Sequence, residues 1–412
     1  MDNQLRADAN MIINSAIQAV KPDKAVRNIL SDVDFPGRVL LVAVGKAAWQ
    51  MANTAYTCLG EQIDSGIIIT KYNHIMGPVG NCICCEAGHP VPDENSFAAT
   101  QKALSLVSNL SENDTVLFLL SGGGSALFEK PLISGKELQS ITKQLLACGA
   151  DIKEINTIRK HLSAVKGGKF AQHCAPAHVF TIVLSDILGD PLDMIASGPA
   201  YPDSTTCQQA RSVANKYGII LSQDAHHALS IETPKMLTNV TTHITGSVRQ
   251  LCAAASATCL SLGYEPILLT DMLCCQAKEA GSFLASILRT QAGSGRKLAF
   301  LAGGETVVHL TGTGKGGRNQ ELALSAAMGI DGLDGAAVFS FGSDGTDGPT
   351  DAAGGYVDGS TAKRLASQGI DIATVLKDND AYHALQKCDG LIITGPTGTN
   401  VNDLSVALLS GR

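Results

Sequence analysis

Apolar residues recur along the chain in two different patterns. Near the N-terminus, between Ile12 and Val20, they are spaced three and four residues apart, and Pro22 interrupts the series. Positions with this spacing share one face of a helix. Residues 7–31 are therefore predicted to form a helix, a turn and a short second helix.

Farther along the chain the apolar residues form short continuous runs, which are typical of buried strands. Eight runs are predicted to be strands: Val39–Val44, Gly66–Ile69, Val116–Leu120, Val179–Leu184, Pro266–Leu269, Leu298–Ala302, Ala336–Phe341 and Leu391–Thr394. Most of the intervening stretches are long enough for a helix, which is typical of parallel sheets with crossover connections. The last apolar run, Leu404 to Leu409, is predicted to be a C-terminal helix in the core.

The length of 412 residues exceeds what one ordinary core supports, so we expect two domains. Residues 201–245 contain Pro202 and Pro234 and no strong strand pattern. We place the division there, with domains at 1–235 and 236–412. The first helices could pack on either domain. The predicted fold class is α/β.

Glycine, hydroxyl and carboxylate side chains are concentrated directly after the predicted strands. The loops concerned are Gly45–Lys46, Ser121–Ser125, Ser185–Asp190, Gly303–Glu305, Gly342–Gly345 and Gly395–Asn400. In open parallel sheets, ligands bind at this edge because helix N-termini and free backbone amides face it. We expect one site assembled from several of these loops.

Two glycine-rich loops could bind phosphate. Ser121–Ser125 holds three consecutive glycines, which either let the backbone approach a phosphate or form a plain tight turn. Gly312–Gly317 matches the G-x-G-x-x-G pattern, but Asp331 and Asp334 precede the next strand instead of ending it, which disfavours a nicotinamide site. A flexible turn, or an anion pocket formed by the glycine amides, Lys315 and Arg318, remain alternatives for this loop. No G-x-x-x-x-G-K-[ST] sequence occurs, which excludes a P-loop.

Carboxylates follow two of the strands in clusters. They are Asp186, Asp190 and Asp193 in the first cluster and Asp344, Asp347 and Asp351 in the second. Neighbouring carboxylates repel one another unless a cation is present, and a Mg²⁺ ion that accompanies ATP is a natural candidate. Helix capping is the alternative. The basic side chains that could complete a phosphate site are Lys46, Arg159, Lys166 and Arg318.

The amino-acid composition and the net charge disfavour binding to nucleic acids and to anionic lipid. Aromatic residues make up 4% of the chain and the net charge is −7, so neither a stacking platform for nucleic acids nor a general attraction to anionic lipid is expected. The N-terminal residues lack the pattern of a secretion signal, and no apolar run reaches the length of a membrane span, so we expect a cytoplasmic protein. Because a secretion signal is not found, the twelve cysteines are interpreted as reduced thiols and not as a disulfide framework. Metal binding by these thiols is disfavoured, since the two well-spaced pairs of a zinc site are missing.

Eight segments together resemble one known family. They are Val44–Ala48, Ser121–Ala126, Asn156–Ser163, Ser185–Asp193, Ala196–Pro199, Gly303–Thr306, Gly316–Glu321 and Ser343–Gly348. In this order they are similar to the class II glycerate kinases, also called the MOFRL family, from about residue 38 to residue 405. The segment Glu86–Pro90 also matches, although the cysteines just before it are unusual for the family.

The resemblance implies ATP-dependent phosphorylation of D-glycerate, usually at the 2-hydroxyl, with Mg²⁺. It implies a Rossmann-like N-terminal domain with a mainly parallel sheet, a smaller α/β C-terminal domain, and an active site in the cleft between them. It assigns catalysis to Lys46 and Arg318, whose positive charges would stabilise the migrating phosphoryl group. Asp186 or Asp190 would hold the metal or accept the hydroxyl proton.

We assign nucleotide and substrate binding to the loops described above. The residues are Gly45, Ser121, Gly122, Gly123, Gly124, Ser125, Arg159, Lys166, Ser185, Asp186, Gly189, Asp190, Glu305, Asn319, Glu321, Asp344, Asp347 and Asn400. Two other functions stay open: an NAD(P)H-dependent hydroxypyruvate reductase, and a sensor of sugar acids or nucleotides without catalytic activity. No nucleic-acid or membrane partner is expected, and both a monomer and a homodimer are compatible with the sequence.

Overall fold

The computed structural model describes residues 3–411 and divides into two compact units. One unit is Ala25–Thr245, and the other combines the residues up to Lys24 with those from Gly246 onward. The division at residues 235 and 236 stays a prediction about domains, because a compact unit is defined by its internal packing and not by independent folding. None of the helices between residues 3 and 411 combines the length and the apolar character that a membrane span requires.

The unit Ala25–Thr245 is built on a six-stranded sheet in which every neighbouring pair is parallel. The strand order is β3-β2-β1-β4-β5-β6, the order of dinucleotide-binding folds. The strands are β1 (Val39–Val44), β2 (Ile63–Lys71), β3 (Cys82–Ala87), β4 (Thr115–Leu120), β5 (His178–Val183) and β6 (Val240–Ile244). The predicted Rossmann-like unit with a mainly parallel sheet is confirmed.

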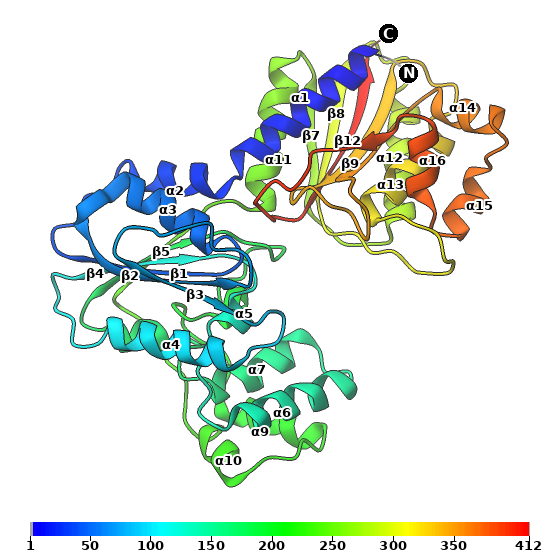
Figure 1. The fold of residues 1–412 in the computed structure, drawn as a ribbon. Coiled ribbons are helices and arrows are strands. Elements are labelled where there is room, and N and C mark those ends of the chain that lie inside the picture. The colour runs from blue at the N-terminus through cyan, green and yellow to red at the C-terminus, as the bar shows by residue number, and fades with distance from the viewer. Residues whose placement is uncertain (1–2, 412) are drawn as a thin grey trace. The chain divides into compact units, whose positions relative to one another are not determined.

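Helices cover both faces of this sheet (Figure 1). Helix α3 (Ala48–Leu59) packs on one face with α2 (Pro22–Leu30), and α4 (Glu94–Leu106) and α8 (Lys169–Cys174) pack on the other. Strands β1 and β4 are completely buried because both of their faces are covered, which explains their continuous apolar runs.

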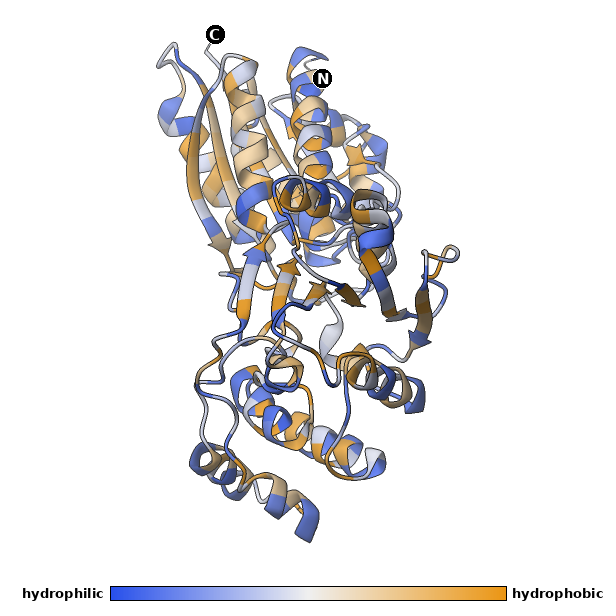
Figure 2. Cartoon of the chain, turned by 90° about the vertical axis from the view of Figure 1, so that its left-hand side faces the viewer, coloured by the Kyte–Doolittle hydropathy of each residue, from blue (hydrophilic) through white to orange (hydrophobic). Residues whose placement is uncertain are grey.

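A separate group of helices extends from the same unit. It comprises α6 (Gly135–Ala147), α7 (Ile152–Leu162), α9 (Cys207–Lys216) and α10 (Gln223–Ala228), which share a small apolar core. Figure 2 shows hydrophobic and hydrophilic residues on different faces of these helices, as expected where one face packs and the other meets water. The short α5 (Gly124–Leu127) follows β4 directly.

The other unit also contains a six-stranded sheet, in the order β11-β10-β9-β12-β8-β7. Only β7 pairs with β8 in parallel, and the other four pairs are antiparallel. The strands are β7 (Glu265–Leu273), β8 (Lys297–Gly304), β9 (Ala336–Gly342), β10 (Gly354–Asp358), β11 (Leu391–Ile392) and β12 (Asp403–Ser410). The α/β class is confirmed here, but the sheet is mixed and not parallel.

Helices flank both faces of this second sheet as well. On one face α12 (Ala277–Gln291) packs against α13 (Arg318–Gly329), and on the other α1 (Asn3–Ala19) packs against α11 (Val248–Ser261) (Figure 1). Three short helices complete the unit: α14 (Thr361–Ser367), α15 (Ile372–Lys377) and α16 (Ala381–Lys387). The predicted helix, turn and short helix at the N-terminus are confirmed as α1 and α2.

The prediction of a C-terminal helix was wrong. Leu404 to Leu409 belong to β12, which lies between β8 and β9 in the middle of the sheet. All of these residues are buried, as predicted for a core segment. A central strand that is covered on both faces has no alternation of apolar and polar residues, so its pattern cannot be distinguished from that of a short buried helix.

Candidate active site

A first group of predicted site residues lies where β1 and β4 end side by side. The order of the strands reverses at this pair, and such a point opens a crevice at the carboxyl edge of the sheet. Gly45 follows β1 with a φ of 121°, and a Cβ added there would lie 2.2 Å from Ser121 Oγ. Ser121 Oγ accepts a hydrogen bond from the amide of Ala47 at 3.1 Å. The two loops therefore interlock, and Ser121 is a buried part of their junction.

The triple-glycine loop brings three chemically active side chains together. A Cβ added to Gly122 would lie 2.2 Å from Asp186 Oδ2, and one added to Gly123 would lie 3.0 Å from the His89 ring and 3.3 Å from Lys46 Cγ. The backbone at Gly122 and Gly123 can lie against all three side chains because glycine has no side chain. Burial, together with the charge of Lys46, lowers the pKa of His89, which favours a neutral imidazole there.

The loop after β5 carries the first carboxylate cluster. Ser185 is buried and its hydroxyl donates to the carbonyl of Ile187 at 3.2 Å, so it shapes the turn. Gly189 and Asp190 both have left-handed backbone conformations, with φ of 80° and 53°. Asp190 Oδ1 is buried without a hydrogen-bond partner among the residues the structure describes. An unsatisfied carboxylate oxygen of this kind is a plausible ligand for a cation.

Side chains of α7 stabilise the triple-glycine loop through hydrogen bonds. Arg159 Nη2 donates to the Ser125 carbonyl at 3.0 Å, and Asn156 Oδ1 accepts from Ser197 Oγ at 3.0 Å. Ser197 Oγ lies 3.1 Å from Ser125 Oγ, and Gly124 is in close contact with Ala196. Residues 156–159 and residues 196–197, which are distant from the loop in the sequence, therefore fix its conformation.

Lys166 lies deeper than a ligand-binding side chain usually does. It is fully buried, with Nζ 2.8 Å from Glu129 Oε2 and 2.9 Å from the carbonyl of Phe128. Burial lowers the pKa of Lys166 to about 8. The predicted binding role is untested, and in this arrangement the ammonium group faces Glu129.

A second group of predicted site residues lies in the other unit and is centred on Arg318, the first residue of α13. Its guanidinium makes a bidentate contact with Asp403, at 2.5 Å from Nε to Oδ2 and 3.0 Å from Nη2 to Oδ1. Nη1 lies 3.0 Å from Glu305 Oε1. Burial alone would lower the pKa of Arg318, but the contact with Asp403 outweighs it and raises the pKa above its usual value. The side chain is 35% exposed, so part of the guanidinium remains accessible.

Asp347 caps the N-terminus of α13 from within the core. Its carboxylate accepts hydrogen bonds from the backbone amides of Asn319 at 3.1 Å and Gln320 at 2.9 Å. A Cβ on Gly317 would lie only 2.2 Å from this carboxylate, so the glycine is required for the approach. Burial raises the pKa of Asp347 to about 7 in spite of these donors. Asp347 therefore positions the helix that begins with Arg318.

The remaining predicted site residues of this unit lie on α13 and in the loops after β9 and before β12. Asn319 is buried and accepts from Ser340 Oγ at 2.5 Å, whereas Glu321 accepts from Asn379 Nδ2 at 3.2 Å. Asp344 Oδ1 accepts the amide of Thr346 at 3.0 Å, and Asn400 is exposed in the loop before β12. Glu321 thus faces a different neighbour from Arg318, although both belong to α13.

The Gly312–Gly317 loop is a tight packing element. Cβ atoms on Gly312 and Gly314 would lie 2.3 and 2.5 Å from atoms of Asp378 and Asp380. The amides of Gly312 and Lys315 donate to side chains of the same segment. These glycines are therefore explained by close contact between two loops, which favours the turn interpretation over an anion pocket.

Comparison with known proteins decides the family. A domain of unknown function (DUF4147) matches residues 8–230, and the MOFRL family matches residues 298–403. A D-glycerate 2-kinase from Thermotoga maritima is 54% identical over 404 residues, which are 97% of this chain and 97% of that protein. The chain belongs to the MOFRL family of glycerate kinases.

Other relatives agree with this assignment. A glycerate 2-kinase from Pyrococcus horikoshii is 40% identical over 97% of this chain and 96% of that protein. The crystal structure of the glycerate kinase from Thermotoga maritima matches with a TM-score of 0.95 at 53% identity, and covers 98% of this chain and 99% of that one. The family resemblance predicted from the ordered loops is confirmed.

Two residues of the site were missed from the sequence. His89 belongs to a segment that matched the family, but nothing in the sequence placed it beside Lys46 and Gly123. Asp403 was not noticed because it immediately precedes an apolar run that was interpreted as a helix. As the first residue of β12 it pairs with Gly304 of β8 and Gly342 of β9, which places its carboxylate beside Arg318. A strand interpretation of that run would have pointed to it.

Proposed function

We propose that the protein transfers the γ-phosphoryl group of ATP to the 2-hydroxyl of D-glycerate and releases 2-phosphoglycerate and ADP. The observation that carries the proposal is Lys46 against the triple-glycine loop at the reversal point of a parallel sheet. This point is suited to a nucleotide, since glycine amides and a lysine can surround its phosphates. The 54% identity to a D-glycerate 2-kinase supports the choice of acceptor.

Lys46 and Arg318 are proposed to act together on the transferred group. Phosphoryl transfer spreads negative charge over the equatorial oxygens, and fixed cations stabilise that charge more than they stabilise the ground state. Asp403 engages two of the five N–H donors of Arg318 and holds the guanidinium in place. The N–H groups of Arg318 that remain accessible would bind a phosphoryl or carboxylate oxygen. We propose that the two units bring these side chains to one reaction site.

Asp186 and Asp190 would hold a Mg²⁺ ion that accompanies ATP. Their carboxylate oxygens are the ligands that Mg²⁺ prefers, and the buried, unpartnered Oδ1 of Asp190 fits such a role. The ion would supply positive charge to the phosphate oxygens. A side chain of the protein would accept the proton of the glycerate hydroxyl. The candidate acceptors are the same two carboxylates and the neutral imidazole of His89.

Product analysis tests the proposal directly. Purified protein is incubated with ATP, Mg²⁺ and D-glycerate, and the product is examined by proton-coupled phosphorus NMR. A phosphate on the 2-hydroxyl couples to one proton on its carbon, whereas a phosphate on the 3-hydroxyl couples to two. We expect the single coupling. Absence of any phosphoglycerate would contradict the proposal, and NADH oxidation with hydroxypyruvate would favour a reductase instead.

A Lys46→Met variant separates a kinase from a sensor. A kinase should lose turnover by about 10²- to 10³-fold while its circular dichroism spectrum stays unchanged. A sensor would have no turnover in the wild-type protein, and the substitution would affect only ligand affinity.

A further inference from the structure

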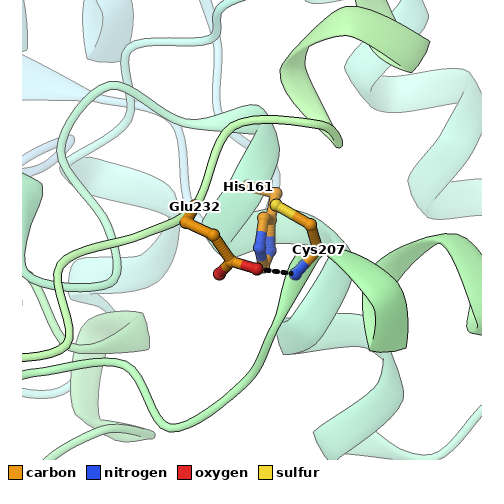
Figure 3. Close-up of side chains that lie close together, drawn as sticks. All are labelled: His161, Cys207 and Glu232. Atoms are coloured by element: carbon orange, nitrogen blue, oxygen red, sulfur yellow. Dashed lines mark hydrogen bonds between the residues drawn. The ribbon is translucent and has the colours of Figure 1, made fainter.

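Three side chains with metal-binding atoms meet in the helical part of the unit Ala25–Thr245. His161 lies near the end of α7, Cys207 is the first residue of α9, and Glu232 lies in the loop that precedes β6. One nitrogen, sulfur or oxygen atom of each lies within 4.8 Å of those of the other two (Figure 3). Neither the proposed phosphoryl transfer nor the braces of the glycine loop use any of the three.

His161 has the geometry of a histidine prepared to bind a metal. It is fully buried, and its Nδ1 lies 2.9 Å from the carbonyl of Thr157. A carbonyl only accepts hydrogen bonds, so Nδ1 carries the proton and the lone pair of the neutral ring is on Nε2. Nε2 is buried and makes no hydrogen bond to any residue from 3 to 411. Metal-binding histidines usually hold their second nitrogen in this way.

Cys207 and Glu232 face this nitrogen from two other segments. Cys207 is 4% exposed, and its backbone amide donates to Glu232 Oε1 at 2.9 Å, which holds the carboxylate over the cluster. The exposed side chain of Glu232 leaves the group open to solvent on one side. Figure 3 shows the imidazole, the thiol and the carboxylate gathered around one space.

We propose that His161, Cys207 and Glu232 bind a zinc ion, with water as the fourth ligand. Thiolate and imidazole favour zinc over the oxygen-seeking Mg²⁺, and the thiolate and carboxylate together balance its two positive charges. Zinc–ligand bonds of about 2.0–2.3 Å put tetrahedral ligands roughly 3.5 Å apart. Since the three ligand atoms lie within 4.8 Å of one another, they need to approach by about 1.3 Å at most.

The ion would hold three parts of the chain together. It would join α7, α9 and the loop at Glu232, three segments that are far apart in the sequence. Because α7 also carries Asn156 and Arg159, which brace the triple-glycine loop, the ion would hold that helix in position. Nearby charges are already engaged: Lys169 Nζ donates to the carbonyls of Lys160, His161 and Ser163, and Lys235 lies 3.0 Å from Glu232 Oε2.

Cobalt substitution tests the site independently of kinase activity. The full chain is stripped with a chelator and titrated with Co²⁺, which reports a bound thiolate through a charge-transfer absorption band. We expect the band in the wild-type protein and in the control Cys148→Ser, whose thiol is exposed at the end of α6. Zn²⁺ should abolish the band by displacement, and Mg²⁺ should not.

The variants Cys207→Ser and Glu232→Gln decide the assignment. Cys207→Ser should lose the band, and Glu232→Gln should weaken Co²⁺ binding by at least about 10-fold. Glu232 is exposed, so its variant keeps the test readable if a buried substitution prevents folding. No band in the wild-type protein, or a band that survives in folded Cys207→Ser, would overturn the proposal.

Discussion

At the scale of single residues, the most unusual feature is a charge pair inside an apolar core. Lys166 and Glu129 are both completely buried, beside the packed rings of Phe118, Phe128 and Phe170. Removing two charges from water costs several kcal/mol, which their mutual attraction offsets only while both are present. The pair therefore makes each partner dependent on the other.

Lys166→Met should destabilise the unit Ala25–Thr245 by about 3–5 kcal/mol, because it removes the direct ion-pair partner of the buried Glu129 carboxylate. Trp49, the only tryptophan of the chain, lies in this unit and reports its unfolding by fluorescence in urea. The double variant Lys166→Met, Glu129→Leu should recover most of the loss. A double variant as unstable as the single one would show that Lys166 contributes through packing and not through its charge.

Asp347 should make stability depend on pH in an unusual direction. In the folded protein its carboxyl keeps a proton up to a pKa of about 7, compared with an ordinary value of 3.8. The folded state therefore binds more protons between these values, so this residue's contribution to stability falls as the pH rises from about 4 to about 7. A difference of roughly three pKa units corresponds to at most about 4 kcal/mol.

The measurement compares wild type with Asp347→Asn, which does not titrate. Free energies of unfolding in urea, followed by circular dichroism at about pH 5 and about pH 8, should show wild type losing stability relative to the variant at the higher pH. A difference that grows with pH would mean that the hydrogen bonds from Asn319 and Gln320 keep the carboxylate ionised.

Individual residues of the candidate site were only partly predictable. Lys46 and Arg318 stood out because glycine-rich segments surround them and match a family. The sequence did not show which side chains Asp403 and His89 lie beside, since these neighbours are distant in the sequence: Arg318 is 85 residues from Asp403. Lys166 looked like a ligand-binding cation from its sequence, and only burial revealed its partner Glu129.

At the scale of elements, the loops after β1, β4 and β5 depend on one another. Gly122 is the point where the loop after β4 meets the loop after β5, since an added Cβ would lie 2.2 Å from Asp186 Oδ2. A displacement of about 1 Å at a reacting centre can cost roughly 10²-fold in rate. The glycine is thus required by contact and not by backbone conformation.

Gly122→Ala should lower kcat/KM by about 10²-fold by displacing Asp186, with little loss of stability. Gly149→Ala is the matched control: its φ of 74° makes the substitution strained, but a Cβ there meets no neighbour. That variant should lose about 1 kcal/mol of stability and keep its kinetics. Steady-state kinetics and urea unfolding of both variants check the prediction, and equal kcat/KM values for the two would contradict it.

Elements were predicted well where their apolar runs were long and bounded by glycine. The strands β1, β4, β5, β8 and β9 were all found close to their expected positions. Strand β6 was missed because it lies at the edge of the sheet and its three central residues, two threonines and a histidine, are polar. The cysteines at positions 82, 84 and 85 also belong to an edge strand, β3, where small apolar residues suffice.

At the scale of the whole molecule, the strand directions were the least predictable feature. Both sheets have six strands and flanking helices, and their sequences show the same alternation of apolar runs and helical stretches. Two of the four antiparallel pairs in the second sheet arise because β12 inserts between β8 and β9 from the end of the chain. Such an insertion is a long-range pairing that no local pattern encodes.

Cooperation between the two units is the last consequence that can be tested. We propose that Lys46 and Arg318 stabilise the same transferring group, and that this stabilisation requires both side chains. Removing either one would then abolish it, so the reductions in kcat from the two substitutions should not multiply. Lys46→Met and Arg318→Met should each lower kcat by about 10²- to 10³-fold. The double variant should then be little worse than the poorer single one, whereas independent roles would give a combined loss of about 10⁴- to 10⁶-fold. Lys46→Met combined with Lys363→Met, an exposed lysine on α14, controls for a general effect of charge and should match Lys46→Met alone.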